Sequence, residues 1–350
     1  MSRVAVAMSG GVDSSAAAAL LLEAGRDVFG VTMRLGLAEL ADRRCCGEEE
    51  VLLARRVCDA LGIQHVVLDM APEFASEVVE PFCADYAAGL TPNPCVRCNE
   101  RIKFGAFLKR VKRLGADALA TGHYARVALI AGQAWLERGA DRQKDQSYFL
   151  YRVPPESLAM LEFPLGDLTK LEVRALAEER GLPTAARRES QEVCFTNDHA
   201  AFVTARHPEA GTPGPVESTN GTVLSTHRGI ASYTVGQRKG LGLSGPRGPY
   251  RVVRIDAARN AVIVGAAKTL SLEQVTLAES VWRLPESARV LAQVRYRGHP
   301  LTATATPDES GLSVQFDTPT DGLAPGQSLV LYQGDRVVGG GVVPASALRS

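Results

Sequence analysis

Short apolar runs alternate with amphipathic stretches along the first two hundred residues of the chain. Runs of the strand type cover Val4–Met8, Val28–Met33 and Val66–Met70. Between the second and third runs, Glu48–Leu61 carries apolar residues at helical spacing and is followed by Gly62, a residue type that commonly ends helices. The alternation predicts an α/β domain with a doubly wound parallel sheet.

Three later helices are predicted in the same half of the chain. Apolar residues at helical spacing indicate one over Phe74–Tyr86 and another over Phe104–Leu114. The third carries clear end signals, because Thr169 and Glu172 form a T-x-x-E capping box and Gly181 stands past the expected end.

The pattern changes after about residue 205. The Pro- and Gly-rich stretch at 207–215 predicts a linker. Short strands separated by Gly and Asp turns are then expected at Arg251–Ile255, Ala261–Val264, Leu291–Tyr296, Leu301–Thr306, Leu312–Phe316, Ser328–Tyr332 and Val337–Val343. Such strands are typical of small β-barrels. We therefore expect a catalytic α/β domain at 1–204, a small, mainly-β central domain at 205–270 and a C-terminal β-barrel at 271–350.

The overall composition says little about function, but the distribution of charged residues along the chain is informative. No apolar run approaches the roughly 20 residues that a membrane helix needs, and the first residues lack the pattern of a secretory signal. We therefore expect a cytoplasmic protein with no membrane partner. The net charge is zero, yet residues 201–270 hold nine Lys and Arg against three Asp and Glu. This basic centre could bind a polyanion or could simply be a solvated face.

A glycine- and serine-rich loop, M-S-G-G-V-D-S-S, joins the first predicted strand to the first predicted helix. Its amides, its hydroxyls and the positive end of the helix could together bind a phosphate. Asp13 would repel a phosphate, so we interpret it as a Mg²⁺ ligand. The loop resembles the pyrophosphate loop of ATP pyrophosphatases, although a plain Gly-rich turn is the alternative. The predicted nucleotide-binding residues are Met8, Ser9, Gly10, Gly11, Val12, Asp13, Ser14 and Ser15.

The seven cysteines are an odd number and are dispersed, which argues against a structural disulfide framework. Cys95 and Cys98 form a single Cys-x-x-Cys, so half a zinc site, a redox pair and a nucleophile all remain open at this point. The adjacent Cys45 and Cys46 are interpreted as a pair in a loop or at the start of a helix. Two further cysteines fall in amphipathic patterns and are expected in the core, namely Cys58 and Cys83.

A family resemblance narrows these interpretations. The loop at 8–15 is followed, in order and across nearly the whole chain, by the motifs CCGEEEVLLARRVCDALGI, TPNPCVRCNERIKFG, ATGHYAR, KDQSYFL, ESQEVCF, YTVGQRKGLG and PGQSLVLY. Together they resemble the bacterial-type tRNA-specific 2-thiouridylases. The resemblance implies an enzyme that uses ATP and Mg²⁺ to adenylate the 2-oxygen of wobble uridine 34 and then replaces that oxygen with sulfur.

The resemblance also assigns roles to two thiols. It implies that Cys98 is the nucleophile and that Cys194 accepts sulfur as a persulfide, the pair finishing as a disulfide that a reductant reopens. The sulfur is expected from a cysteine desulfurase or a sulfur-relay protein, and the substrate is the tRNA anticodon stem-loop. Cys95 stands where some members carry Asp, so it is a bystander or a helper of altered pKa. Alternatively Cys95, Cys98 and Cys194 hold a [4Fe-4S] cluster, or take part in a zinc site.

Substrate contacts follow by the same resemblance. Met33 and Gly122 are implied as further ATP contacts, and the target base is implied to meet Asn93, Pro94 and Cys95. Contacts with tRNA are implied for His123, Lys144, Asp145, Gln146, Tyr296, Arg297 and Gln327. A turn histidine at 123, a helix start at 144–146 and an exposed strand at 295–297 are the structural alternatives; such a strand would place Arg295 and Arg297 on one face.

One tRNA contact is predicted from the residues themselves. Arg238 and Lys239 lie in the basic segment, in the expected loop Gln237–Leu241, and we predict that they contact tRNA phosphates. Two rival functions remain: another adenylating enzyme with the same loop, such as an amidotransferase or argininosuccinate synthase, and a nucleotide- and iron–sulfur-binding sensor that binds RNA without modifying it.

Overall fold

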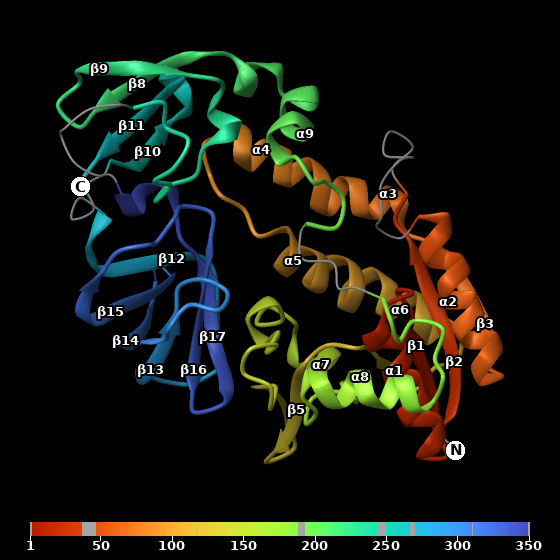
Figure 1. Cartoon of the computed structure of the whole chain (residues 1–350). Coiled ribbons are helices and arrows are strands. Elements are labelled where there is room, and N and C mark those ends of the chain that lie inside the picture. The colour runs from red at the N-terminus through yellow and green to blue at the C-terminus, as the bar shows by residue number, and fades with distance from the viewer. Residues whose placement is uncertain are drawn as a thin grey trace. The chain divides into compact units, whose positions relative to one another are not determined.

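The computed structural model describes residues 2–36, 47–187, 193–243, 250–266, 270–309 and 311–348 (Figure 1). The chain divides into two compact units, and each is described by itself. The first unit consists of Met1–Val78, Cys95–Asn197 and Asp335–Val337. The second consists of Val79–Pro94, Asp198–Gly334 and Val338–Ser350.

The first unit is built on a five-stranded parallel sheet in the order β3-β2-β1-β4-β7. The strands are β1 (Arg3–Ala7), β2 (Asp27–Arg34), β3 (His65–Asp69), β4 (Ala118–Ala120) and β7 (Leu161–Glu162). The strand order reverses at β1, which confirms the doubly wound prediction. In such sheets ligands bind beyond the carboxyl ends of the strands near this reversal, where the loop after β1 lies.

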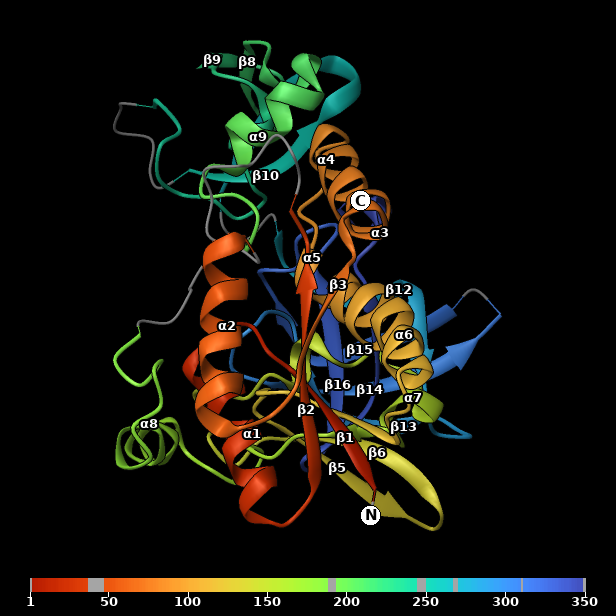
Figure 2. The ribbon, with the colours of Figure 1, turned by 90° about the vertical axis from the view of Figure 1, so that its right-hand side faces the viewer.

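Helices cover both faces of this sheet (Figure 2). One face carries α1 (Val12–Glu23), α2 (Glu48–Leu61) and α8 (Lys170–Glu179). Small buried residues of α1, from Ala16 to Ala19, let this helix lie close to the strands. The end signals expected from the sequence are confirmed: Gly62 is left-handed after α2, and α8 begins with the complete Thr169–Glu172 capping box.

The other face is covered by one continuous helix that is partly π-helical. It runs through α5 (Pro94–Arg97), a π segment (Cys98–Phe107) and α6 (Leu108–Arg113), and we call it the thiol helix. It is longer than the helix predicted at 104–114. The helix predicted at 74–86 likewise contains a π segment, Ala75–Val79, between α3 (Ala71–Phe74) and α4 (Glu80–Ala87).

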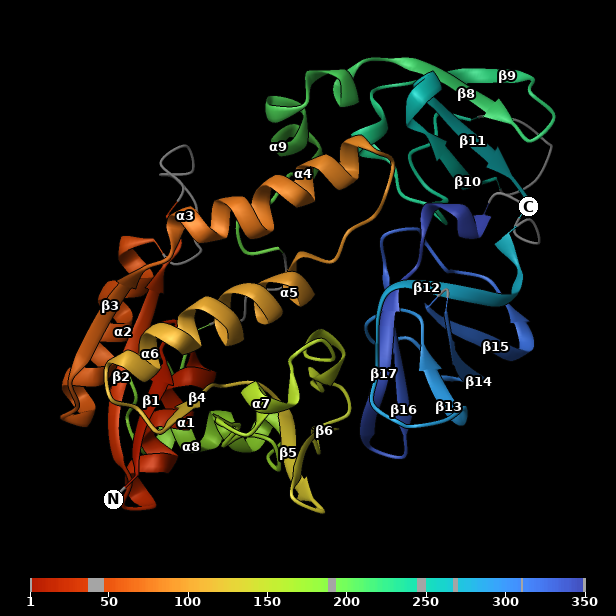
Figure 3. The same ribbon diagram turned by 180° about the vertical axis from the view of Figure 1, so that it is seen from behind.

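The sequence pattern did not indicate the hairpin of β5 (Ala125–Ile130) and β6 (Gln133–Arg138), visible in Figure 3. Its two-residue turn has Ala131 at φ 50° and Gly132 at φ 81°, the left-handed conformations that a tight hairpin turn requires. The short helix α7 (Pro155–Leu158) follows later in the same unit.

The second unit contains the central four-stranded mixed sheet, in the order β10-β11-β8-β9. Its strands are β8 (Gly214–Ser218), β9 (Val223–His227), β10 (Arg251–Asp256) and β11 (Ala261–Gly265), and α9 (His199–Arg206) precedes them. The predicted linker at 207–215 is wrong. Pro208–Gly211 forms a 3-10 helix around the fully buried Ala210, and β8 begins at Gly214, because the prolines and glycines here shape packed turns.

The same unit contains a closed, six-stranded antiparallel barrel in the order β12-β15-β14-β13-β16-β17, with β12 also paired to β17 (blue strands, Figure 1). Its strands are β12 (Leu272–Trp282), β13 (Ala288–Gln293), β14 (Leu301–Asp308), β15 (Gly311–Thr320), β16 (Ser328–Gln333) and β17 (Arg336–Val342). The predicted barrel is confirmed. Throughout the described ranges, the structure contains no helix with the length and apolar content needed to cross a membrane.

Candidate active site

The loop between β1 and α1 is shaped as an anion-binding turn. Gly10 has φ +67°, and Gly11 is the N-cap of α1 with extended backbone. Gly11 has no side chain that could cap the first turn, so the amides at this helix end are not covered by an N-cap side chain. Uncapped amides at the positive end of a helix are the donors that phosphate groups use.

The serine hydroxyls mainly hold this loop in shape. The Ser14 hydroxyl donates to the Gly11 carbonyl oxygen at 3.1 Å and accepts from the Ser9 amide at 3.2 Å. The Ser15 hydroxyl donates to the same carbonyl at 2.9 Å and accepts from the Thr184 hydroxyl at 2.8 Å. Ser15 is fully buried, so its hydroxyl stabilises the turn, although the sequence had suggested a phosphate donor.

Two glycines lie where a side chain could not fit. A Cβ on Gly10 would lie 2.8 Å from the Glu50 carbonyl oxygen, and one on Gly122 would lie 2.7 Å from the Asp13 carbonyl carbon. Gly122 therefore supports the loop from behind. The Arg187 guanidinium joins this support by donating to the Gly10 carbonyl oxygen at 2.7 Å.

Asp13 already has two partners from distant parts of the chain. Its carboxylate oxygens lie 2.7 and 2.9 Å from the Lys170 ammonium, and the Tyr124 hydroxyl donates to it at 2.8 Å. Sequence reasoning missed both partners. Lys170 looked only like the first residue of a well-capped helix, and nothing local signals that it reaches the loop.

The residues fit a nucleotide-bound Mg²⁺ only through Asp13. In the described ranges, no group of three or more His, Cys, Asp or Glu side chains is placed to hold a metal ion. Mg²⁺ in nucleotide sites commonly uses one or two carboxylates together with substrate phosphates, so one carboxylate is sufficient. The predicted metal ligand stays a prediction.

Three candidate thiols gather in the first unit. Cys95 and Cys98 lie one helical turn apart at the start of the thiol helix, and both interact electrostatically with Cys194. Phe195 is buried and contacts Phe74 edge-on, at a ring separation of 5.6 Å, which anchors the segment next to Cys194. The sequence distance between the cysteine motifs is therefore bridged by the fold.

Burial suppresses the reactivity of these thiols. Desolvation raises the pKa of Cys98 to about 12, and the nearby Lys103 ammonium offsets only part of that rise. Desolvation likewise raises the pKa of Cys95 to about 11, although this residue is exposed at the surface. Because a thiolate is the nucleophilic form, both thiols are protonated and weakly reactive near neutral pH.

The Gly122–His123–Tyr124 tripeptide joins the loop to the thiol helix. Gly122 backs the loop and Tyr124 bonds to Asp13, while His123 lies between them with its ring 5.8 Å from that of Phe104 on the thiol helix. Burial, reinforced by Lys103, holds the pKa of His123 well below its usual range, so the ring is neutral. These consecutive residues thus link the loop to the middle of the thiol helix, where Lys103 interacts electrostatically with both His123 and Cys98.

The remaining cysteine predictions divide simply. Cys58 and Cys83 are fully buried, as predicted, and burial raises the pKa of Cys58 to about 12. Cys45 and Cys46 lie outside the described residues. In the described part of the chain, the three thiols of the alternative cluster are not arranged as a set of metal ligands.

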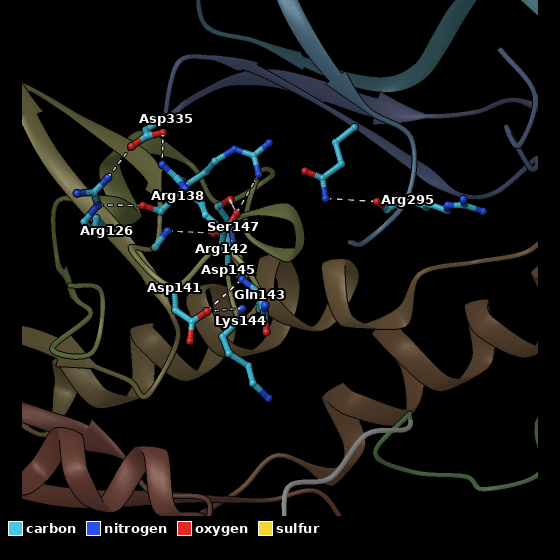
Figure 4. Close-up of polar contacts among 12 residues, drawn as sticks. Arg126, Arg138, Asp141, Arg142, Gln143, Lys144, Asp145, Ser147, Arg295 and Asp335 are labelled. Atoms are coloured by element: carbon cyan, nitrogen blue, oxygen red, sulfur yellow. Dashed lines mark hydrogen bonds and ion pairs between the residues drawn. The ribbon is translucent and has the colours of Figure 1, made fainter. Parts of the chain in front are cut away.

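Asp145 is committed to the protein. It is buried, it pairs with Arg138 at 3.2 Å, and it accepts from the Gly139 amide and from the Ser147 amide and hydroxyl (Figure 4). Gln146 accepts from the Tyr124 amide at 3.0 Å, whereas the Lys144 side chain points away from the Asp145 network in Figure 4. A carboxylate this well bonded organises the loop, and the predicted tRNA contacts here stay predictions.

The second unit gives its predicted contacts different settings. The strand expected through Tyr296 ends at Gln293, and Arg297 has φ +58° in a turn closed by the Gly298 amide on the Arg295 carbonyl, so the shared face for Arg295 and Arg297 is wrong. The reason is that the barrel strand stops where the chain must turn.

Another predicted contact, Gln327, donates its side-chain amide to the Thr91 carbonyl at 2.8 Å, two residues before Asn93. This bond holds the start of the T-P-N-P stretch. Pro94 is buried, and Arg238 and Lys239 are exposed on their loop. Met33 lies near the carboxyl end of β2, at the same end of the sheet as the phosphate loop.

Comparison with known proteins shows which family has this arrangement of domains. A family model described as the tRNA methyl transferase HUP domain matches residues 2–198, a PRC-barrel domain of the same name series matches 200–266, and an aminomethyltransferase beta-barrel domain matches 269–343. Proteins called tRNA-specific 2-thiouridylase MnmA match nearly end to end. The protein from Moorella thermoacetica is 47% identical over 98% of this chain and 99% of its own, and that from Chloroflexus aurantiacus 46% over 97% and 98%.

A third such relative, from Magnetococcus marinus, is 45% identical over 97% of this chain and 98% of its own. Fold and site therefore define a HUP-domain protein of the tRNA-modifying class, extended by a PRC-barrel-like domain and a C-terminal β-barrel. Because the full-length relatives agree, the chain belongs to the tRNA-specific 2-thiouridylase family.

Proposed function

We propose that this protein is an ATP-dependent tRNA-uridine 2-sulfurtransferase that converts wobble uridine 34 to 2-thiouridine, releasing AMP and pyrophosphate. Membership of the thiouridylase family supports the activity. The order of chemistry follows from the substrate, because a carbonyl oxygen is a poor leaving group and adenylation makes it a good one. Sulfur must therefore arrive after ATP has reacted.

The first step uses the phosphate loop. The 2-oxygen of uridine attacks the α-phosphorus of ATP, the bond to the β-phosphate oxygen breaks, and pyrophosphate leaves with the electron pair. The amides around Gly10 and Gly11 and the start of α1 would hold the phosphates. Bound Mg²⁺ would neutralise phosphate charge, with Asp13 as its protein ligand. Gly122 keeps the loop in the shape that this binding needs.

The second step uses two thiols. The terminal sulfur of a Cys194 persulfide attacks carbon 2, and AMP leaves with the former carbonyl oxygen. The Cys98 thiolate then attacks the Cys194 sulfur, which forms a Cys98–Cys194 disulfide and leaves sulfur doubly bonded to the base. The sulfane sulfur gains the two electrons that the thiols lose, and a reductant must later reopen the disulfide.

One observation carries this proposal: consecutive residues connect the two chemistries. Gly122 and Tyr124 contact the loop segment that includes Asp13, and His123 between them packs beside the helix that begins with the thiols. The loop and the thiols also belong to one compact unit, which supports a single site for both steps. We propose that Asn93, Pro94 and Cys95 position that flipped base, and that tRNA and a cysteine desulfurase or relay protein are the partners.

The decisive experiment is a thiolation assay with ATP, tRNA, cysteine and a cysteine desulfurase, read by mass spectrometry of the nucleosides. We expect 2-thiouridine from the wild-type protein and none above background from the Cys98→Ser variant, with tRNA binding retained. The Cys95→Ser variant is the matched comparison, since it changes the other thiol of the same helical turn. Full thiolation by Cys98→Ser would break the mechanism, and loss of product from Cys95→Ser would show that Cys95 takes part.

A further inference from the structure

Helices α1 and α8 are joined by an ion pair at each end. At their first turns the Lys170 ammonium bonds to both carboxylate oxygens of Asp13, and at their last turns Arg180 pairs with Glu23, with Nη2–Oε2 at 2.7 Å. Buried Val12, Ala19 and Ala177 pack in one cluster around the two helices. Both ion pairs thus hold the two helices together, but only the Lys170–Asp13 pair involves a residue of the phosphate loop.

The surroundings of the two pairs differ. The side chain of Lys170 is 9% exposed, whereas that of Arg180 is 28% exposed. The backbone at Lys170 is fixed, because the Thr169 capping box precedes it and its own amide donates to Asp141 at 3.0 Å. Only the flexible four-carbon side chain of Lys170 is left to move. Its ammonium group is a compact positive charge of the kind that binds phosphate.

The contacts of Asp13 create a conflict for nucleotide binding. Lys170 takes part in bonds to both carboxylate oxygens, and the Tyr124 hydroxyl adds a third donor. A metal ion carried by ATP would compete with the ammonium for these oxygens, because both are cations and repel each other. When the metal reaches Asp13, the ammonium must turn toward another anion, and the phosphates at the loop are the nearest that the reaction supplies.

We propose that Lys170 is a substrate-binding residue of the adenylation site, held on Asp13 in the present structure and transferred to the β- and γ-phosphates when Mg²⁺·ATP binds. This inference rests on the proposed function. Lys170 stays charged throughout, so no proton moves. Its ammonium would stabilise the charge that gathers on pyrophosphate as the bond to the α-phosphorus breaks.

The test is calorimetric binding of pyrophosphate, AMP and ATP to the full-length protein, with and without Mg²⁺. For Lys170→Met we expect pyrophosphate and ATP to bind about tenfold to a hundredfold more weakly, because the variant loses one charged hydrogen-bond donor. The affinity for AMP should stay within about threefold of the wild-type value. Lys170→Arg should recover part of the loss. Arg180→Met is the matched control, because it removes the ion pair at the other end of the same helices and should leave all three affinities unchanged.

A second variant keeps the proposal open to refutation if Lys170→Met does not fold. Asp13→Asn releases the ammonium, so Mg²⁺-free pyrophosphate should bind more tightly than to wild type, about threefold or more, while Mg²⁺·ATP binds more weakly.

The contrary outcomes are distinct. Unchanged pyrophosphate binding in Lys170→Met, or an equal loss of AMP and pyrophosphate, would reduce Lys170 to a structural partner. Weaker Mg²⁺-free binding in Asp13→Asn would overturn the proposal as well. If the wild-type protein bound neither ATP nor pyrophosphate, the proposed function itself would fail, which separates the two claims.

Discussion

The phosphate loop and the thiols Cys95 and Cys98 lie in the same unit but differ in how ready they are to react. The loop is fully shaped: Ser15 is bonded to Gly11 and Thr184, and Gly122 supports the backbone. The thiols are weakly nucleophilic. Burial raises the pKa of Cys98 to about 12, so this thiol is protonated. Near pH 8 only about one Cys98 side chain in ten thousand would be a thiolate.

This difference indicates that ATP binding comes before sulfur transfer. A loop whose backbone needs no rearrangement can bind ATP with side-chain movement alone, whereas a protonated, buried thiol waits for a change in its surroundings. The π segment from Cys98 to Phe107 offers one means of change, because its i→i+5 pattern places Lys103 over Cys98. A thiol that stays protonated until the base is activated is also protected from oxidation and premature reaction.

The largest expected effect concerns thiol reactivity. In the protein without tRNA, Cys98 should react with iodoacetamide about thirtyfold to a hundredfold more slowly at pH 8 than an unperturbed thiol, after allowing for the greater nucleophilicity of a more basic thiolate. Its raised pKa means that the thiolate fraction grows as pH rises, so the rate should increase about tenfold per unit from pH 7 to 10 without a plateau.

Peptide mass spectrometry after timed labelling measures each cysteine separately. Cys95 should label faster than Cys98, because it is exposed and its pKa is raised less. A plateau near pH 7 for Cys98 would show that the thiol is already activated and would remove the contrast between the two regions.

The next effect tests the loop. Gly122→Ala would place a methyl group 2.7 Å from the Asp13 carbonyl carbon and 2.8 Å from the Ser14 amide nitrogen, so the loop backbone must move. We expect ATP affinity to fall about tenfold to a hundredfold, as displaced amides lose charged hydrogen bonds. Calorimetry measures this, and Gly36→Ala is a suitable control because nothing lies within 4 Å of its Cβ. Normal ATP affinity in Gly122→Ala would mean that the loop is not preformed.

The smallest effect concerns the tRNA contacts predicted in the second unit. Arg238 and Lys239 are exposed on a loop of the basic central segment. Replacing both with Ala should reduce the slope of log affinity against log salt concentration by up to roughly 0.9 for each phosphate that the variant no longer neutralises. The salt dependence of tRNA binding, compared with the wild type, measures the change, while ATP affinity should stay the same. An unchanged slope would mean that Arg238 and Lys239 do not contact tRNA phosphates.

Much of the architecture was predictable because its causes are local. The apolar runs of β1 and β2, the capping box at Thr169 and the left-handed Gly62 each depend on a few neighbouring residues. The β5–β6 hairpin escaped prediction because the left-handed Ala131 in its turn is an unusual residue for that conformation. The false linker at 207–215 shows the opposite error, since Pro and Gly punctuate packed turns as readily as loose ones.

The sequence alone determined the kinds of chemistry present: a glycine–serine turn for phosphate and cysteines in two separate motifs, since residue type and local order settle both. Which groups work together depends on how distant segments pack in three dimensions. Lys170 meets Asp13 across 157 residues, and Asp145 is buried against Arg138 although its segment looks exposed and polar. Burial also set the pKa of Cys98. These outcomes depend on packing between distant segments, which local spacing does not encode.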